Sequence, residues 1–238
     1  MNENTFNYDY IIVGGGSAGC VLANRLSENP KNKVLLLEAG GKDNYLWIHV
    51  PVGYLYCMGN PRTDWGFQTS NQKGLNGRSL NYPRGRVLGG CSSINGMIYM
   101  RGQSNDYDNW QQMGNTGWGW DDVLEYFKKS EDYYDTSDEM HGSGGEWRVE
   151  EQRLSWEILD AYRDAAEEYG IIKIDDFNRG DNEGSSYFRV NQKNGWRWNT
   201  SKAFLRPVKS RKNLQIVTNA QVQKVLFHEK SAVGVEVK

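Results

Sequence analysis

Three glycines near the N-terminus have the spacing of a nucleotide-binding turn. Gly14, Gly16 and Gly19 form a GxGxxG pattern directly after the apolar run 10–13, and Glu38 closes a second apolar run. Glycines at these positions permit a sharp turn, close approach of a pyrophosphate to the backbone, and tight packing of a helix on a strand. The acidic residue accepts hydrogen bonds from ribose hydroxyls. The pattern predicts a βαβ unit that binds an ADP-containing cofactor.

The residues around these glycines fit such a unit. Ala18, Leu22 and Leu26 recur at helical spacing, and residues 33–37 have the composition of a buried parallel strand. The negative charge of Glu38 disfavours a 2′-phosphate on the ribose. The alternative is a glycine-rich turn without a ligand in some other α/β protein.

Composition narrows the function classes. The chain has 238 residues and a net charge of −2, so nothing favours nucleic acid or an anionic membrane as a partner. No apolar run approaches the length of a membrane-spanning helix, and the N-terminus lacks a basic leader. The three cysteines and three histidines show no metal-binding spacing, so no metal site is expected. Free thiols indicate a cytoplasmic protein.

The rest of the chain predicts further elements of an α/β fold. The predicted elements are helices over 118–133 and 155–169 and strands over 214–218, 222–227 and 232–237. The apolar face of the second helix contains Ile158, Tyr162, Ala165 and Tyr169. Residues 41–117 have few periodic segments, which in a compact domain indicates wrapping around a ligand. Because the chain stops inside its last predicted strand, we expect a piece of a longer protein rather than a natural edge strand.

The segment 83–102 is the second motif that points to a ligand. Its glycines and small hydroxyl side chains allow backbone N–H groups to press against a flat polar ligand, and its arginines suit phosphates. The Gly-Gly-Cys-Ser-Ser run at 89–93 has the composition of an anion-binding nest.

The segment 83–102 resembles the first signature of the glucose–methanol–choline (GMC) oxidoreductases, flavoproteins that oxidise alcohols. Other stretches similar to the family are residues 8–20, 36–40, 63–65, 141–142 and 218–222. Within the family the resemblance is closest to the choline dehydrogenases and related bacterial alcohol dehydrogenases. It implies an α/β fold in which a Rossmann-like FAD-binding domain is interleaved with an incomplete α+β substrate-binding domain.

The resemblance also implies a division of the chain. Residues 1–134 and 211–238 are expected to belong to the FAD-binding domain, and residues 135–210 to part of the substrate-binding domain. The C-terminal half of the family is expected to be absent. Because absence of that half would expose sheet edges and apolar faces, we expect this chain by itself to be poorly soluble.

FAD is the cofactor that the resemblance implies. The positions that match cofactor contacts in the family are Gly14, Gly16, Ser17, Ala18, Gly19, Glu38, Ala39, Trp65, Arg86, Val87, Gly90, Asn95, Gly96, Met97, Ile98 and Val222. From the residues alone, Trp65 would be taken as a core residue and Val222 as a plain strand residue. Ile94 stands where some members attach FAD through a histidine, so non-covalent binding is expected. Cys91 stands where most members have Ser or Thr, and we expect a buried structural thiol.

The activity implied is oxidation of the CH–OH group of an alcohol, from primary alcohol to aldehyde, with hydride passing to flavin N5. The family's base is a histidine of the C-terminal half, paired with a second histidine or an asparagine, and this position lies beyond Lys238. His49, His141 and His228 do not match it, so no catalytic residue is named in this chain. His141 belongs to a His-Gly motif and is expected to shape access to the substrate domain.

Two other functions stay open at this point. One is a flavin-bound enzyme of the hydroxynitrile lyase type, because the same fold hosts that chemistry. The other is a non-catalytic FAD-binding fragment. The alcohol and the electron acceptor are not specified by the sequence, although choline would need an aromatic or acidic cage for its quaternary ammonium.

Overall fold

A computed structural model describes residues 7–238, which divide into two compact units. Unit 1 comprises the residues up to Gly96 together with 199–238, and unit 2 comprises 97–198. The boundaries between the compact units therefore fall after residues 96 and 198. The boundaries expected between the FAD-binding and substrate-binding segments fall after residues 134 and 210. The division by role stays a prediction, because compactness does not assign a role.

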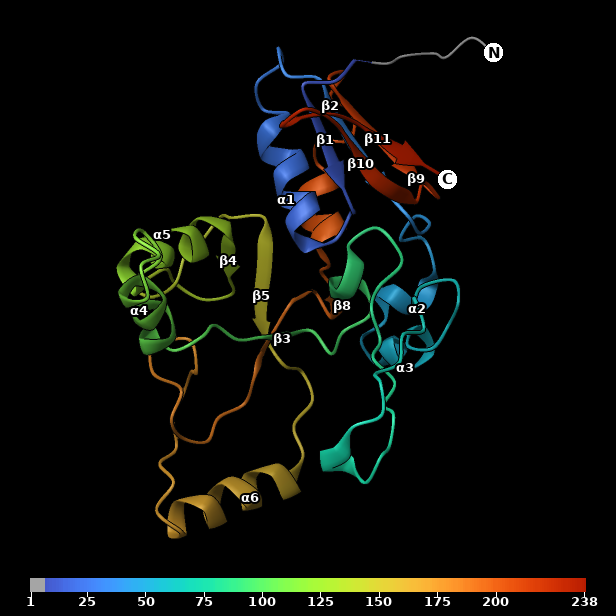
Figure 1. Ribbon diagram of the computed structural model, residues 1–238. Helices are drawn as coiled ribbons and strands as arrows, with labels where there is room; N and C mark the ends of the chain where they lie inside the picture. The colour runs from blue at the N-terminus through green and yellow to red at the C-terminus, as the bar shows by residue number, and fades with distance from the viewer. Residues whose placement is uncertain (1–6) are drawn as a thin grey trace. The chain divides into compact units, whose positions relative to one another are not determined.

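Unit 1 is built on a three-stranded parallel sheet with strand order β1-β2-β9 (Figure 1). Its helices and strands are β1 (Tyr10–Val13), α1 (Ser17–Leu26), β2 (Val34–Glu38), α2 (Leu46–His49), α3 (Tyr54–Cys57), β9 (Leu214–Thr218), β10 (Val222–His228) and β11 (Ser231–Val237). Short 3-10 turns cover Pro51–Gly53, Lys73–Leu75 and Gly90–Ser93, and a π-helical turn covers Ser201–Leu205.

The central strand carries most of the buried apolar surface of this sheet. All five residues of β2 are buried, and β2 pairs in parallel with β1 on one side and β9 on the other. This confirms the predicted buried parallel strand, shifted by one residue. The predicted strand 214–218 is confirmed, and the last two predicted strands form the antiparallel hairpin β10–β11. Parallel pairing of β1 and β2 across α1 is the predicted βαβ unit.

Unit 2 contains a four-stranded mixed sheet with strand order β3-β6-β5-β4. Its helices and strands are β3 (Ile98–Tyr99), α4 (Ser104–Gln112), α5 (Trp120–Ser130), β4 (Glu131–Tyr133), β5 (Trp147–Glu151), α6 (Glu157–Glu168), β6 (Arg189–Val190), β7 (Gln192–Lys193) and β8 (Trp196–Arg197). The helix predicted over 118–133 is shorter than expected. It ends at Ser130, because residues 131–133 form β4 and pair in parallel with β5.

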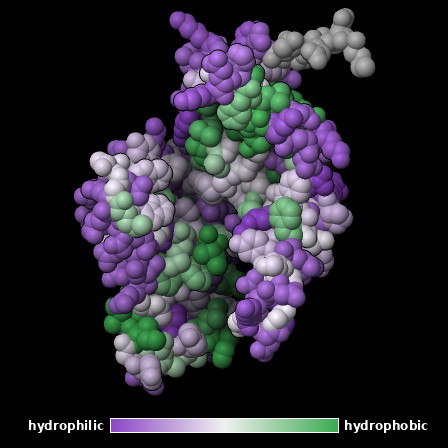
Figure 2. All heavy atoms as spheres, in the orientation of Figure 1, coloured by the Kyte–Doolittle hydropathy of each residue, from purple (hydrophilic) through white to green (hydrophobic). Residues whose placement is uncertain are grey.

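Helix α6 exposes the face that its sequence pattern predicts to be apolar. Side chains on this face are 68% exposed at Ile158 and 72% at Tyr162, and Tyr169 just beyond the helix is 88% exposed. Apolar surface is visible over α6 at the lower end of the view (Figure 2). The amphipathic pattern is therefore real, but unit 2 alone does not bury it.

None of the helices between residues 7 and 238 has both the length and the apolar character needed to cross a membrane. Over the same residues, no group of three or more His, Cys, Asp and Glu side chains is arranged to hold a metal ion.

Candidate dinucleotide-binding site

The N-terminus of α1 provides backbone donors without a capping side chain. Gly16 is the N-cap residue and supplies no side-chain hydrogen bond to the first turn, which contains Ser17, Ala18 and Gly19. A helix N-terminus of this kind carries free N–H groups and the positive end of the helix dipole, which together favour a phosphate. Gly19 is required sterically, because a Cβ there would lie 1.9 Å from the carbonyl oxygen of Gly14. At Gly16 a Cβ would meet no atom within 4 Å, so this glycine faces open space.

Glu38 is held at the end of β2 by backbone groups of two loops. Gly15 N–H donates to one carboxylate oxygen and Gly40 N–H to the other, each over 2.7 Å. Burial raises the pKa of Glu38, and these two N–H groups, together with the charge of Arg86, oppose that rise. The side chain is fixed in one orientation, and its remaining lone pairs are those that ribose hydroxyls would use.

The glycine-rich segment of the second motif is joined to both of these loops. Gly89 N–H donates to Gly15 O over 2.7 Å, and Leu88 N–H donates to Gly41 O over 3.0 Å. Gly90 lies against Gly16 so closely that a Cβ would come 2.7 Å from the Gly16 Cα. Two motifs far apart in the sequence therefore meet through their backbones, and the contact requires glycine at position 90.

Trp65 and Arg86 come together beside this junction. The guanidinium carbon of Arg86 lies 5.0 Å from the centre of the Trp65 ring, within the range of a cation–π contact. Trp65 also stacks on Phe67, with ring centres 5.6 Å apart. The Arg86 Nε is buried and has no hydrogen-bond partner among residues 7–238. A buried donor without a partner is costly, so this guanidinium suits an anionic or carbonyl group of a ligand.

A cleft of about 280 Å³ lies where the glycine turn, Glu38 and the second motif meet. Its lining residues are Val13, Gly14, Gly16, Leu37, Glu38, Ala39, Trp65, Gly85, Gly90, Ala220, Gln221 and Val222. Of the residues expected at the cofactor, the structure thus brings seven to one cleft: Gly14, Gly16, Glu38, Ala39, Trp65, Gly90 and Val222. The Val222 segment is attached to β2, because Ala220 N–H donates to Glu38 O over 2.9 Å.

Nine expected cofactor residues do not line this cleft: Ser17, Ala18 and Gly19 form the first turn of α1, Arg86 lies on Trp65, and the remaining five lie elsewhere. Val87 is buried in a core cluster with Ile48, Cys57 and Ile94. Asn95 and Gly96 are exposed at the end of unit 1. Met97 and Ile98 belong to unit 2, where Asn191 N–H donates to Met97 O over 2.9 Å and Ile98 pairs with Val190.

Three glycines outside the set of individually expected cofactor contacts shape this site, although Gly85 begins the segment expected to lie along the flavin. Besides Gly15, they are Gly40, where a Cβ would lie 1.9 Å from Arg86 O, and Gly85, where a Cβ would lie 2.2 Å from the backbone of Gly90. Their signal in the sequence is the recurrence of glycine next to both apolar strands and within the second motif.

The expectation of a buried Cys91 is wrong. Cys91 is exposed, whereas Cys20 and Cys57 are buried, and all three are free thiols. Gly85 N–H lies 3.5 Å from the Cys91 sulfur, and the neighbouring Gly90 occupies the contact with Gly16. The side chain of Cys91 is left at the surface because its neighbours, Gly90 and the buried Ser92, take the inward positions.

His141 is part of a buried ionic network in unit 2. Its Nδ1 lies 3.2 Å from Glu131 and its Nε2 3.1 Å from Asp176, and Arg101 lies 3.0 Å from Glu131. Burial alone would lower the pKa of His141, but its hydrogen bonds with Asp176 and Glu131 outweigh burial and raise it. The structure therefore places this histidine in the interior of unit 2, between two carboxylates.

Comparison with known proteins identifies the family. The chain matches the GMC oxidoreductase family over residues 8–238. An alcohol dehydrogenase [acceptor] of Pseudomonas putida is 46% identical over 96% of this chain, and an oxygen-dependent choline dehydrogenase of Vibrio vulnificus is 43% identical over 97%. The chain spans 42% and 41% of the lengths of these two proteins.

A solved structure agrees with this assignment. The pyridoxine 4-oxidase of Mesorbium loti superposes with a TM-score of 0.93 at 35% identity, over 97% of this chain and 46% of that one. The protein belongs to the GMC oxidoreductase family. The predicted α/β fold with a Rossmann-like FAD-binding domain is confirmed, and the family is one of FAD-dependent enzymes.

Proposed function

We propose that the cleft of unit 1 binds the ADP half of a non-covalently held FAD, and that the full-length protein oxidises a primary alcohol to an aldehyde. The observation that carries this proposal is the convergence of Gly16, Glu38 and Gly90 on one cleft from separate parts of the chain. The membership of the chain in the GMC family supports FAD as the dinucleotide.

The residues present fit FAD. Uncapped N–H groups at the start of α1 suit the pyrophosphate, and the open space at Gly16 leaves room for it. Glu38 accepts hydrogen bonds from the adenosine ribose and disfavours a 2′-phosphate. Ala220 and Val222 provide an apolar wall in the same cleft. Ile94 is buried in the core cluster and cannot form a bond to a flavin, which supports non-covalent binding.

In the alcohol reaction, FAD supplies the electron acceptor for the hydride of the alcohol carbon. The residues of this chain would bind and orient the cofactor: the N-terminus of α1 and Glu38 would hold the dinucleotide, and the glycine backbones of Gly15, Gly16 and Gly90 would leave room for it. Proton removal from the alcohol is assigned to the part of the family polypeptide that follows this chain in the relatives. The names of the two relatives support choline or another alcohol as substrate.

The test is a visible absorption spectrum of the purified full-length protein without oxygen, before and after addition of choline or a simple primary alcohol. Flavin bands that bleach on addition of one of these alcohols support the proposal. Flavin bands that persist with every alcohol tried contradict the alcohol reaction but leave FAD binding in place. A protein that takes up no flavin contradicts both.

A further inference from the structure

Asp64 is a buried carboxylate that accepts hydrogen bonds from backbone N–H groups on either side of Trp65 in the chain and from Arg84. It is 4% exposed. Gly59 N–H donates to its Oδ2 over 2.7 Å, and the N–H groups of Arg84 and Gly66 donate to its Oδ1 over 2.9 and 3.1 Å. Burial alone would raise the pKa of Asp64, but these N–H groups outweigh it and lower the pKa. The carboxylate therefore stays charged and shared among three segments.

The segments joined by Asp64 are those that carry Trp65 and Arg86. Trp65 N–H donates to Arg84 O over 3.0 Å, and Arg86 N–H donates to Thr63 O over 2.8 Å, so the two stretches form a short antiparallel ladder. Asp64 occupies the middle of this ladder, opposite Gly85. The ladder brings the Arg86 guanidinium over the Trp65 ring.

The turns next to Asp64 depend on its carboxylate. Gly59 and Gly66 have φ values of +71° and +67°, a conformation that leaves their N–H groups without partners in a regular ladder. Asp64 accepts from both. Loss of the carboxylate would remove the side-chain acceptor of these partly buried N–H groups and free the loop that presents Trp65.

We propose that Asp64 is a positioning residue of the dinucleotide cleft, which acts through Trp65 and Arg86 without touching the cofactor. The inference rests on the proposed function, because it takes FAD as the ligand of this cleft. It adds a determinant of FAD affinity that lies outside the cleft lining.

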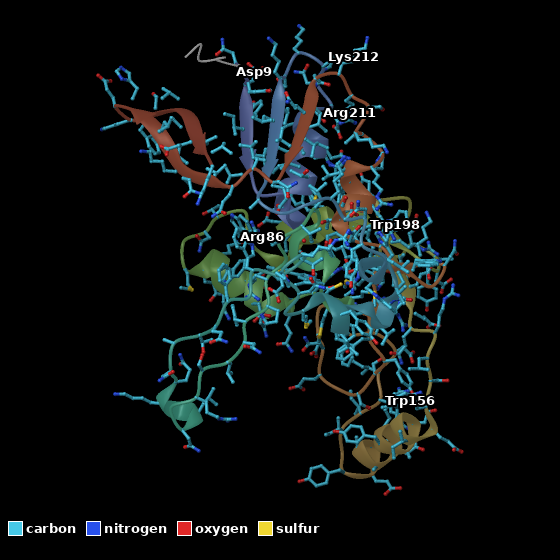
Figure 3. The ribbon with its side chains drawn as sticks, turned by 90° about the vertical axis from the view of Figure 1, so that its right-hand side faces the viewer. Asp9, Arg86, Trp156, Trp198, Arg211 and Lys212 are labelled. Atoms are coloured by element: carbon cyan, nitrogen blue, oxygen red, sulfur yellow. The ribbon has the colours of Figure 1, made fainter. Side chains whose placement is uncertain are left out.

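The experiment measures the FAD dissociation constant of the full-length protein and its variants by flavin fluorescence. Asp64→Asn keeps one acceptor oxygen and removes the charge and the partner of Gly59. Its matched control is Asp9→Asn. Asp9 also accepts a backbone N–H, that of Lys33 over 2.7 Å, but it lies at the opposite end of the sheet from Arg86 (Figure 3).

We expect Asp64→Asn to weaken FAD binding about tenfold, the equivalent of one lost charged hydrogen bond, and Asp9→Asn to leave it unchanged.

The second comparison measures FAD binding by Arg86→Met, with Arg84→Met as its control. The Arg84 guanidinium lies instead on the Tyr82 ring, 3.8 Å from the ring centre. In the double variant Asp64→Asn/Arg86→Met, the loss should not exceed the larger single loss, because both changes remove the same placed guanidinium.

Two results would overturn the inference while the proposed function stands: FAD affinity of Asp64→Asn equal to that of the unaltered protein, or losses that multiply in the double variant. Absence of FAD binding by the unaltered protein would instead refute the proposed function. If Asp64→Asn does not fold, amide hydrogen exchange of the unaltered protein without FAD decides. Slow exchange at Gly59, Gly66 and Arg84 is expected, and fast exchange there refutes the inference.

Discussion

The cleft of unit 1 and the polar interior of unit 2 use polar groups in opposite ways. At the cleft, glycine backbones approach one another and a single carboxylate, Glu38, is held by two N–H groups. In unit 2, four side chains with at most 6% exposure (Arg101, Glu131, His141 and Asp176) satisfy one another as ion pairs. The cleft leaves N–H donors available to a ligand, whereas the side chains of the network pair with one another. The first arrangement is suited to binding and the second to holding a fold together.

The largest expected effect is on the ionic network. Glu131→Gln removes the charge that both Arg101 and His141 face, and it leaves the buried Arg101 guanidinium without its carboxylate. We expect a loss of about 3–5 kcal/mol in the free energy of unfolding. Urea denaturation measures it. Glu139→Gln is the control, because Glu139 is 82% exposed and should change stability by less than about 0.5 kcal/mol. Equal losses in both variants would show that the network does not stabilise unit 2.

The next effect separates folding from binding within one glycine motif. Gly19→Ala places a methyl group against Gly14 O and should destabilise by about 1–3 kcal/mol. Gly16→Ala meets no protein atom and should change stability by less than about 0.5 kcal/mol, yet weaken FAD binding about tenfold or more. Thermal unfolding and FAD titration of both variants measure the two effects. Normal FAD binding by Gly16→Ala would mean that no ligand passes close to that residue.

A third effect is the pH dependence of the stability of unit 2. The pKa of Asp138 is about 2: burial alone would raise it, but the Arg179 guanidinium and the N–H groups of His141 and Met140 lower it. The stabilisation from this lowered pKa is present above the ordinary Asp value of 3.8 and is lost as pH falls toward 2. The raised pKa of His141 acts in the opposite direction. Its stabilisation is complete below the ordinary value of 6.5 and is lost as pH rises through the folded pKa.

Urea midpoints across this range should therefore fall on both sides of a plateau that lies between about pH 4 and pH 6.5. His141→Gln should remove the alkaline fall. A variant that keeps this fall would assign it to another group.

The smallest effect concerns the thiols. Cys91 should react with a thiol reagent in the folded protein, whereas Cys20 and Cys57 should react only after denaturation. Burial raises the pKa of Cys20 to about 12, which suppresses its thiolate. The measurement is the number of thiols titrated with and without urea. Three fast thiols under native conditions would contradict the packing of α1.

The glycine motif was predictable because its requirements are local. The geometry of one turn accounts for the glycines at positions 14, 16 and 19. The burial of β2 follows from a run of apolar residues. The positions of Trp65 and Gly90 at the cleft were expected from the family resemblance, since no local pattern places them there. The proposed role of Asp64 could not be predicted from a local pattern, because one of its hydrogen-bond donors is the N–H of Arg84, twenty residues away in the chain.

The network of unit 2 was not predictable from spacing. Glu131 follows directly on a helical pattern, so the helix was extended over it, but its side chain pairs with Arg101 and His141 and the backbone becomes β4. Cys91 was misjudged for a related reason, because the sequence does not show which side of a glycine-rich turn faces outward. Both errors concern contacts made between distant residues.

The most direct test of the cofactor assignment is calorimetric titration of the full-length protein, freed of flavin, with FAD and with FMN. FMN carries the flavin and one phosphate but lacks the AMP half that Glu38 and Gly16 are proposed to hold. We expect FAD to bind at least about a hundredfold more tightly than FMN, a difference of about 2.8 kcal/mol. Equal affinity for the two flavins, or binding of neither, would contradict the assignment of this cleft to a dinucleotide.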